Sequence, residues 1–103
     1  MSVYPKEYTK NTFIKFLRKN NVSDDIILKF NELPELLAHK NSVYKLNVEV
    51  TWYDIGNTHY NFELNYYSID KMEYLFGLKV FSNVEKSINY LYSELINAKF
   101  IEK

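Results

Sequence analysis

The stretch VYKLNVEVTWYDIGNTHYNFELNYY, residues 43–67, alternates apolar and polar side chains on both sides of a short polar segment, residues 54–57. Outside that segment every even position except Thr58 is apolar, and most odd positions are polar. A period of two is typical of a β-strand that buries one face. The two runs therefore predict an antiparallel hairpin of residues 43–53 and 58–67. Its even-numbered face should be buried, and its odd-numbered face should meet solvent or a partner.

The register of this hairpin follows from charge and turn chemistry. Cross-strand partners share a face, so their residue numbers must sum to an even value. A sum of 112 would place Glu49 opposite Glu63, and two like charges in that position are unfavourable. A sum of 110 leaves the loop Asp54-Ile55-Gly56, with Gly56 in the left-handed position that ends such a loop. We therefore predict the sum of 110, which pairs Tyr44 with Tyr66, Val48 with Phe62 and Val50 with Tyr60.

Two helices are predicted before the hairpin from apolar side chains at helical spacing. The first covers residues 9–20 and stops at the pair Asn20-Asn21, because Asn tolerates the left-handed conformation that closes a helix. Ser23 caps the second, which has two carboxylates in its first turn. Pro34 ends that helix and is suited to open a short helical turn over residues 35–38.

Residues 68–81 fit two interpretations. Alternating apolar residues from Met72 to Val80 indicate a third strand, whereas residues 70–73 form a capping box and Gly77 could stop a helix. We expect a third strand that covers at least Leu78–Phe81, and leave open whether residues 69–77 are strand or helix. The order of elements thus predicts one α+β domain, residues 1–103, in two layers. It consists of N-terminal helices, a three-stranded antiparallel β-meander and a C-terminal amphipathic helix over about Asn83–Lys99 (ααβββα).

The composition narrows the class of protein. Lys plus Arg and Asp plus Glu both number 13, so the net charge is zero and bulk attachment to nucleic acid or membrane is not expected. No apolar run approaches the roughly 20 residues that span a bilayer, and no signal peptide is recognisable. We expect a soluble, cytoplasmic protein. Phe, Tyr, Met, Ile, Asn and Lys make up 51 of the 103 residues, which indicates an AT-rich coding sequence of a bacterium or of its viruses or plasmids.

Catalytic and metal-binding chemistry needs side chains that converge, and few do so here. His39 lies at the end of the predicted helical turn, and His59 lies on the exposed hairpin face opposite Thr51. Glu49 and Glu63 are staggered in the predicted register, as on a solvated strand face. Cysteine is absent and the two glycines are 21 positions apart, which excludes a thiolate site and a glycine-rich phosphate loop. We expect no enzymatic activity, no metal and no cofactor.

The layout of helix, three-stranded meander and helix is similar to that of double-stranded-RNA-binding domains. Gly56-Asn57-Thr58-His59 resembles the hairpin loop of that family. The family grips phosphates with a lysine cluster at the start of its last helix, but Ser82-Asn83-Val84-Glu85-Lys86 offers a single lysine there. The resemblance implies a small RNA-binding module as the alternative function, and the missing cluster predicts no more than non-specific binding to duplex RNA.

A small domain with no catalytic constellation and an excess of aromatic residues is typical of a protein that occludes a larger protein. We predict a small non-enzymatic protein-binding or inhibitory module whose partner is another protein. With the AT-rich coding, this indicates a phage- or plasmid-borne antagonist of a bacterial enzyme or defence system. An anti-CRISPR or other anti-defence protein, an immunity protein and an antitoxin all fit, and a subunit of a homo-oligomer or larger assembly is left open.

The partner-binding residues predicted first are Tyr53, His59 and Tyr67, on the odd-numbered hairpin face. Exposed tyrosines offer large contact areas at small entropic cost. In the predicted register Tyr53 and His59 are diagonal neighbours near the turn, and Tyr67 lies opposite Val43. The second choice is the basic stripe of the first helix, because residues 1–22 carry a net charge of plus four. That stripe consists of Lys15, Arg18 and Lys19.

Overall fold

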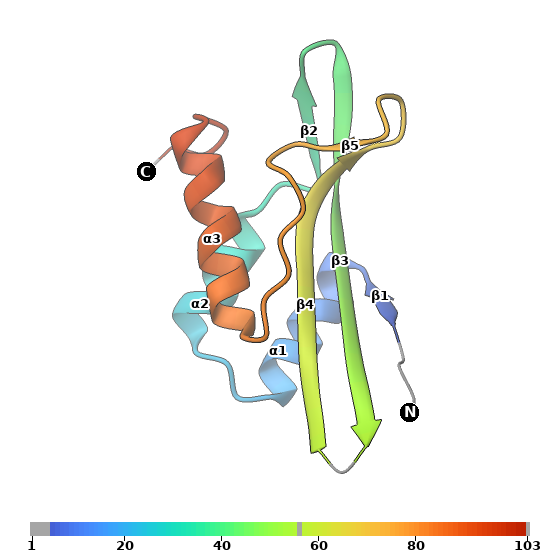
Figure 1. Ribbon diagram of the computed structural model, residues 1–103. Coiled ribbons are helices and arrows are strands. Elements are labelled where there is room, and N and C mark those ends of the chain that lie inside the picture. Colours follow the sequence, from blue (N-terminus) through green and yellow to red (C-terminus); the bar gives the residue numbers. More distant parts are fainter. Residues whose placement is uncertain (1–4, 56, 103) are drawn as a thin grey trace.

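The computed structural model describes the backbone of residues 5–55 and 57–102. It describes the side chains of the same residues except 53–58. The chain folds into a five-stranded antiparallel sheet and three helices (Figure 1). Along the sequence the elements are β1 (Lys6–Tyr8), α1 (Lys10–Lys19), α2 (Asp24–Glu32), β2 (Leu36–His39), β3 (Ser42–Ile55), β4 (Asn57–Ser68), β5 (Glu73–Tyr74) and α3 (Val84–Asn97). The sheet order is β1-β3-β4-β5, and β2 pairs with β3 beyond the end of β1. The α+β class is confirmed, but the predicted ααβββα order lacks β1 and β2.

The predicted helical turn over residues 35–38 is wrong, because this segment forms β2 and pairs with the start of β3. Lys40 and Asn41 connect the two strands with φ angles of 48° and 62°. Two consecutive left-handed residues form the type of tight turn whose twist matches an antiparallel hairpin. His39 therefore ends a strand rather than a helical turn. Its ring packs edge-on against Phe100, at 5.7 Å between ring centroids.

The two helices predicted before the hairpin are confirmed, and so is the predicted Ser23 cap of the second helix. Thr9 and Thr12 form a reciprocal capping box at the start of α1, and Ser23 caps α2. Asn21 adopts the expected left-handed conformation, with φ 57°, after α1 ends. The N–H of Val22 then donates back to the carbonyl of Leu17 at 3.0 Å, which satisfies an orphan carbonyl of the helix.

The predicted hairpin is confirmed, but its register is wrong by two residues. Partner numbers sum to 112, so Glu49 lies directly opposite Glu63. The even-numbered face keeps its apolar pairing in this register, because 112 also places large apolar side chains opposite each other along the hairpin. These pairs are Leu46 with Tyr66, Val48 with Leu64, Val50 with Phe62 and Trp52 with Tyr60. In the 110 register Trp52 would face Thr58, and the repulsion of two partly solvated carboxylates, about 0.2–1 kcal/mol, is too small to exclude the observed pairing. Gly56, whose conformation we predicted, lies outside the described residues.

The predicted third strand is mostly wrong. β5 contains only Glu73 and Tyr74, and the expected strand over Leu78–Phe81 reduces to one bridge. In that bridge Phe81 and Phe62 exchange two backbone hydrogen bonds, of 2.7 and 3.0 Å. The helix alternative for residues 69–77 is also not formed. The chain turns at Met72 and Gly77, with φ angles of 50° and 80°, and neither helix nor strand continues through such residues.

The C-terminal helix is confirmed as α3. Its cap is Asn83, whose side chain accepts from the backbone N–H of Lys86 at 3.0 Å. α3 packs against β4 and α2, and α1 packs against α2 and the aromatic residues of β4. All three helices lie against the face of the sheet that carries the even-numbered residues of β3 and β4 (Figure 1). We call this the covered face.

Candidate protein-binding face of the sheet

The opposite face of the sheet has no layer of helices over it. It carries the odd-numbered residues of β3 and β4, together with their neighbours on β1 and β5, and we call it the open face. Most of its described side chains are half-buried within the sheet surface itself. The residues of the open face used below are Glu7, Asn47, Glu49, Thr51, His59, Asn61, Glu63, Asn65, Tyr67 and Tyr74.

Three carboxylates cross the open face in one row. Glu7 of β1 pairs with Glu49 of β3, which pairs with Glu63 of β4. Neighbouring strands lie about 4.8 Å apart, so each carboxylate adjoins the next. Burial raises the pKa of Glu63, and the negative charge of Glu49 opposite raises it further. The three carboxylates therefore concentrate negative charge on this face and repel one another in the folded chain.

Asn65 lies two residues from Glu63 on the same strand and face. Its side chain is 4% exposed, and neither Oδ1 nor Nδ2 has a hydrogen-bond partner. A buried carboxamide without partners is unfavourable, because it has given up its hydrogen bonds to water. Such groups are rare in folded proteins and call for a specific explanation.

Two tyrosines share the open face with Asn65. Tyr67 of β4 and Tyr74 of β5 are paired residues, and their ring centroids are 4.9 Å apart at an interplanar angle of 56°. Burial raises the pKa of the Tyr74 phenol, and the charges of Glu63, Tyr67 and Glu49 raise it further. The two rings therefore form an aromatic pair at this end of the open face.

A groove of about 730 Å³ opens at the outer edge of β3, in the gap between β1 and β2. Glu7, Asn47 and Lys45 line it from the open face. Glu35 and Leu36 close it on the side of β2. The row of carboxylates therefore ends at a recess rather than on a flat surface.

The predicted partner-binding residues Tyr53, His59 and Tyr67 are all on strands of the open face, with altered neighbours. Tyr53 pairs directly with His59, rather than diagonally, because the register is shifted. His59 is exposed, and the side chain of Tyr53 lies outside the described residues. Tyr67 lies opposite Lys45, not Val43. Its ring packs against that of Tyr74, so it is half-buried and less exposed than we expected.

The second predicted surface is intact but lies apart from the open face. Lys15, Arg18 and Lys19 are exposed on α1, where Arg18 and Lys19 follow Lys15 by about one helical turn. α1 lies on the covered side of the sheet. The structure therefore does not bring this basic stripe together with Tyr67 or with the row of carboxylates.

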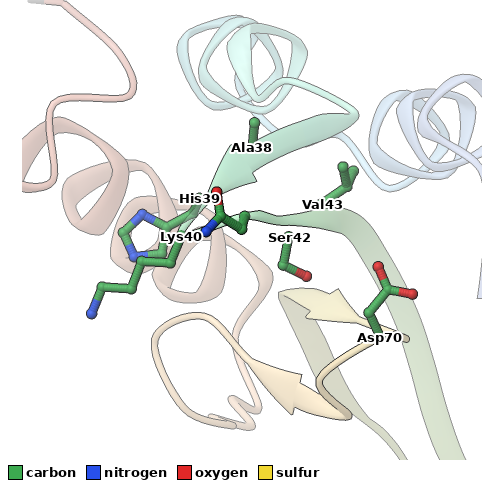
Figure 2. A pocket seen from close by; sticks show the side chains of 7 residues that line it. Ala38, His39, Lys40, Ser42, Val43 and Asp70 are labelled. Atoms are coloured by element: carbon green, nitrogen blue, oxygen red, sulfur yellow. The ribbon is translucent and has the colours of Figure 1, made fainter.

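A second hollow, of about 410 Å³, lies between the β2–β3 turn and the turn after β4. Figure 2 shows His39 and Lys40 on one side of it and Val43 and Asp70 on the other. Its polar groups hold the two turns together, since Lys71 donates from Nζ to the carbonyl of Lys40 at 2.7 Å. We therefore interpret the hollow as the junction between these two turns and not as a binding site.

Sequence reasoning missed three residues of the site. Glu7 was missed because β1 has only three residues and shows no periodicity. The opposition of Glu49 and Glu63 was missed with the register. Tyr74 was missed because β5 is two residues long, and nothing in the sequence marks Asn65 as buried.

Among residues 5–55 and 57–102, no three His, Asp or Glu side chains are arranged to hold a metal ion. Within the same residues, no helix has the length and apolar character needed to cross a membrane. No protein-family model, no curated protein and no solved structure matches this chain. The open face must therefore be interpreted from its own chemistry.

Proposed function

We propose that this chain is a non-enzymatic protein-binding module that acts by covering a functional surface of a larger protein, and that it binds through the open face. The observation that carries the proposal is the buried, unpaired carboxamide of Asn65 beside the opposed pair Glu49 and Glu63. Both features destabilise the free fold. A partner that supplies hydrogen bonds and positive charge would relieve both.

The class of partner follows from charge. A row of three carboxylates repels the phosphates of RNA, so the open face favours a protein partner over the RNA alternative. RNA binding would have to use the basic stripe of α1, Lys15, Arg18 and Lys19. The proposed role remains that of an antagonist, an anti-defence protein, an immunity protein or an antitoxin, since all of these act by covering a partner's surface.

Affinity capture from the organism that carries the gene tests the proposal. The baits are the unaltered chain, Glu63→Lys, and Glu102→Lys as a control of equal charge change off the open face. We expect one protein to be retained by the unaltered chain and by Glu102→Lys, and to be lost with Glu63→Lys. Adding the chain in equal amount should then lower the activity of the captured protein.

Two outcomes contradict the proposal. Capture of nucleic acid, lost on changing Lys15, Arg18 and Lys19 to Glu, would promote the RNA alternative. Equal capture of one protein by Glu63→Lys and the unaltered chain would place the interface elsewhere.

A further inference from the structure

We infer that the open face takes an arginine side chain of the partner, with its guanidinium between Glu49 and Glu63 and its edge against Asn65. The inference rests on the proposed function and names the chemistry of the ligand at that surface. The row of carboxylates, the unpaired amide and the tyrosine pair each contribute a separate argument.

The carboxylates call for a cation with several donors. Glu49 and Glu63 are direct cross-strand partners, so their oxygens lie on both sides of one position above the sheet. A guanidinium has five N–H donors in a rigid plane and binds carboxylates through two parallel hydrogen bonds. A lysine ammonium is a compact charge with three donors and matches this arrangement less well.

Asn65 gives the second and independent argument. Its carboxamide is more than nine-tenths buried, shares the face of Glu63 and has no partner at either atom. Both atoms are shielded from solvent in the free chain, so the groups over Asn65 must move on binding, after which Oδ1 can accept from an N–H of the guanidinium that the carboxylates leave free. Nδ2 can donate to a carbonyl, so the arginine should be presented by a segment whose backbone reaches the sheet.

The tyrosine pair gives the third argument. Tyr67 lies two residues from Asn65 on the same face and packs against Tyr74, and aromatic rings attract planar cations. Arginine stacks on aromatic rings and is hydrated more weakly than lysine, so it loses less on entering a half-buried site.

The open face continues into an apolar end, which predicts more of the partner segment. Val43 and Leu36 lie on this face, 52% and 61% exposed. Val43 lies six positions before Glu49 on β3, a distance of about 20 Å. An extended partner segment should therefore carry an apolar side chain about six residues from its arginine.

A small-molecule titration tests the inference on the full chain. The probes are N-acetyl-arginine amide and its citrulline counterpart, which has the same shape without the charge. The readout is the side-chain NH₂ resonances of Asn65 in a ¹⁵N-correlated spectrum. We expect a saturable shift with the arginine probe, a weaker effect with N-acetyl-lysine amide, and none with citrulline. Equal responses to arginine and citrulline, or no response at Asn65, would overturn the inference.

Neutral variants separate the failure of this inference from that of the proposed function. Glu49→Gln with Glu63→Gln should weaken the arginine probe and the captured protein by about tenfold or more. The matched control, Glu85→Gln with Glu102→Gln, should leave both unchanged. If Glu63→Lys abolishes capture while the paired Gln variant binds normally, the arginine site is wrong and the protein-binding face stands. We expect the paired Gln variant to stay folded, because it removes the repulsion between Glu49 and Glu63.

Discussion

The two faces of the β3–β4 hairpin come from the same two strands, residues 42–55 and 57–68, and differ in how many of their polar groups have partners. On the covered face, Phe13 of α1 is fully buried and contacts three other aromatic rings. Tyr66, also buried there, donates from its hydroxyl to the carbonyl of Pro34 at 2.6 Å. On the open face, Glu49 faces Glu63 and Asn65 has no partner.

The contrast shows where the fold is optimised and where it is not. Deep burial with complete hydrogen bonding is what stability alone requires, and the covered face has both. Opposed like charges and an unpaired amide oppose stability, and they lie together on the open face. Proteins carry such local costs most often at functional sites.

The largest expected effect is on the covered face, at Phe13. Phe13→Ala removes a ring that is 0% exposed and leaves a cavity between α1, α2 and the sheet. We expect the free energy of unfolding to fall by about 3–5 kcal/mol, measured by denaturant unfolding. Thr51→Ala on the open face is the control and should change it by about 0.5 kcal/mol or less. Equal effects of the two changes would contradict the contrast between the faces.

The next effect has the opposite sign and lies on the open face. Asn65→Leu replaces an unpaired carboxamide by an apolar side chain with the same number of heavy atoms and the same branch point. We expect unfolding to require about 1–3 kcal/mol more, since an unsatisfied buried group is removed. Binding of the captured partner should weaken in the same variant. Asn61→Leu, on the same strand and face but only half-buried, is the control. A stability loss for Asn65→Leu would mean that the amide is paired within the fold.

Much of the covered face could be predicted from the sequence, because period-two alternation and helix caps are local signals. Thr9, Ser23 and Asn21 have the roles that their side chains favour. β2 escaped prediction because its hairpin turn uses Lys40 and Asn41, where glycine is the usual signal of positive φ. Its apolar pair Leu36-Leu37 shows no long alternation.

The open face could be predicted only in part, because its chemistry depends on register. Alternation fixes which residues share a face, and Tyr67 and Glu63 were assigned correctly on that basis. Which residues lie opposite each other depends on the combined energy of all cross-strand pairs. The repulsion of Glu49 and Glu63 is only one part of it and did not decide the register. The sequence has no pattern that marks Asn65 as buried, and Tyr74 lies on a two-residue strand that no local pattern reveals.

Adjacent tyrosines on opposite faces sharpen the comparison. Tyr66→Phe removes the hydrogen bond to the Pro34 carbonyl and should lower the free energy of unfolding by about 1 kcal/mol. Tyr67→Phe, one residue later on the open face, should lower it by less than about 0.5 kcal/mol. The two unfolding curves, measured in parallel, check the order. A larger loss at Tyr67 would show that its hydroxyl is part of the fold's own bonding.

The smallest expected effect is at Glu63, and its pH dependence identifies the cause. Because the pKa of Glu63 is raised in the folded protein, the native state holds the proton more tightly than the unfolded chain does. The group therefore destabilises the fold above its folded pKa, and this penalty disappears as the pH falls below the unfolded value of 4.5. Glu63→Gln should raise the free energy of unfolding by about 0.5 kcal/mol at pH 7, and by nothing once both states are protonated. Denaturant unfolding from pH 3 to 8 measures the difference. A gain that persists at low pH would assign it to packing instead of charge.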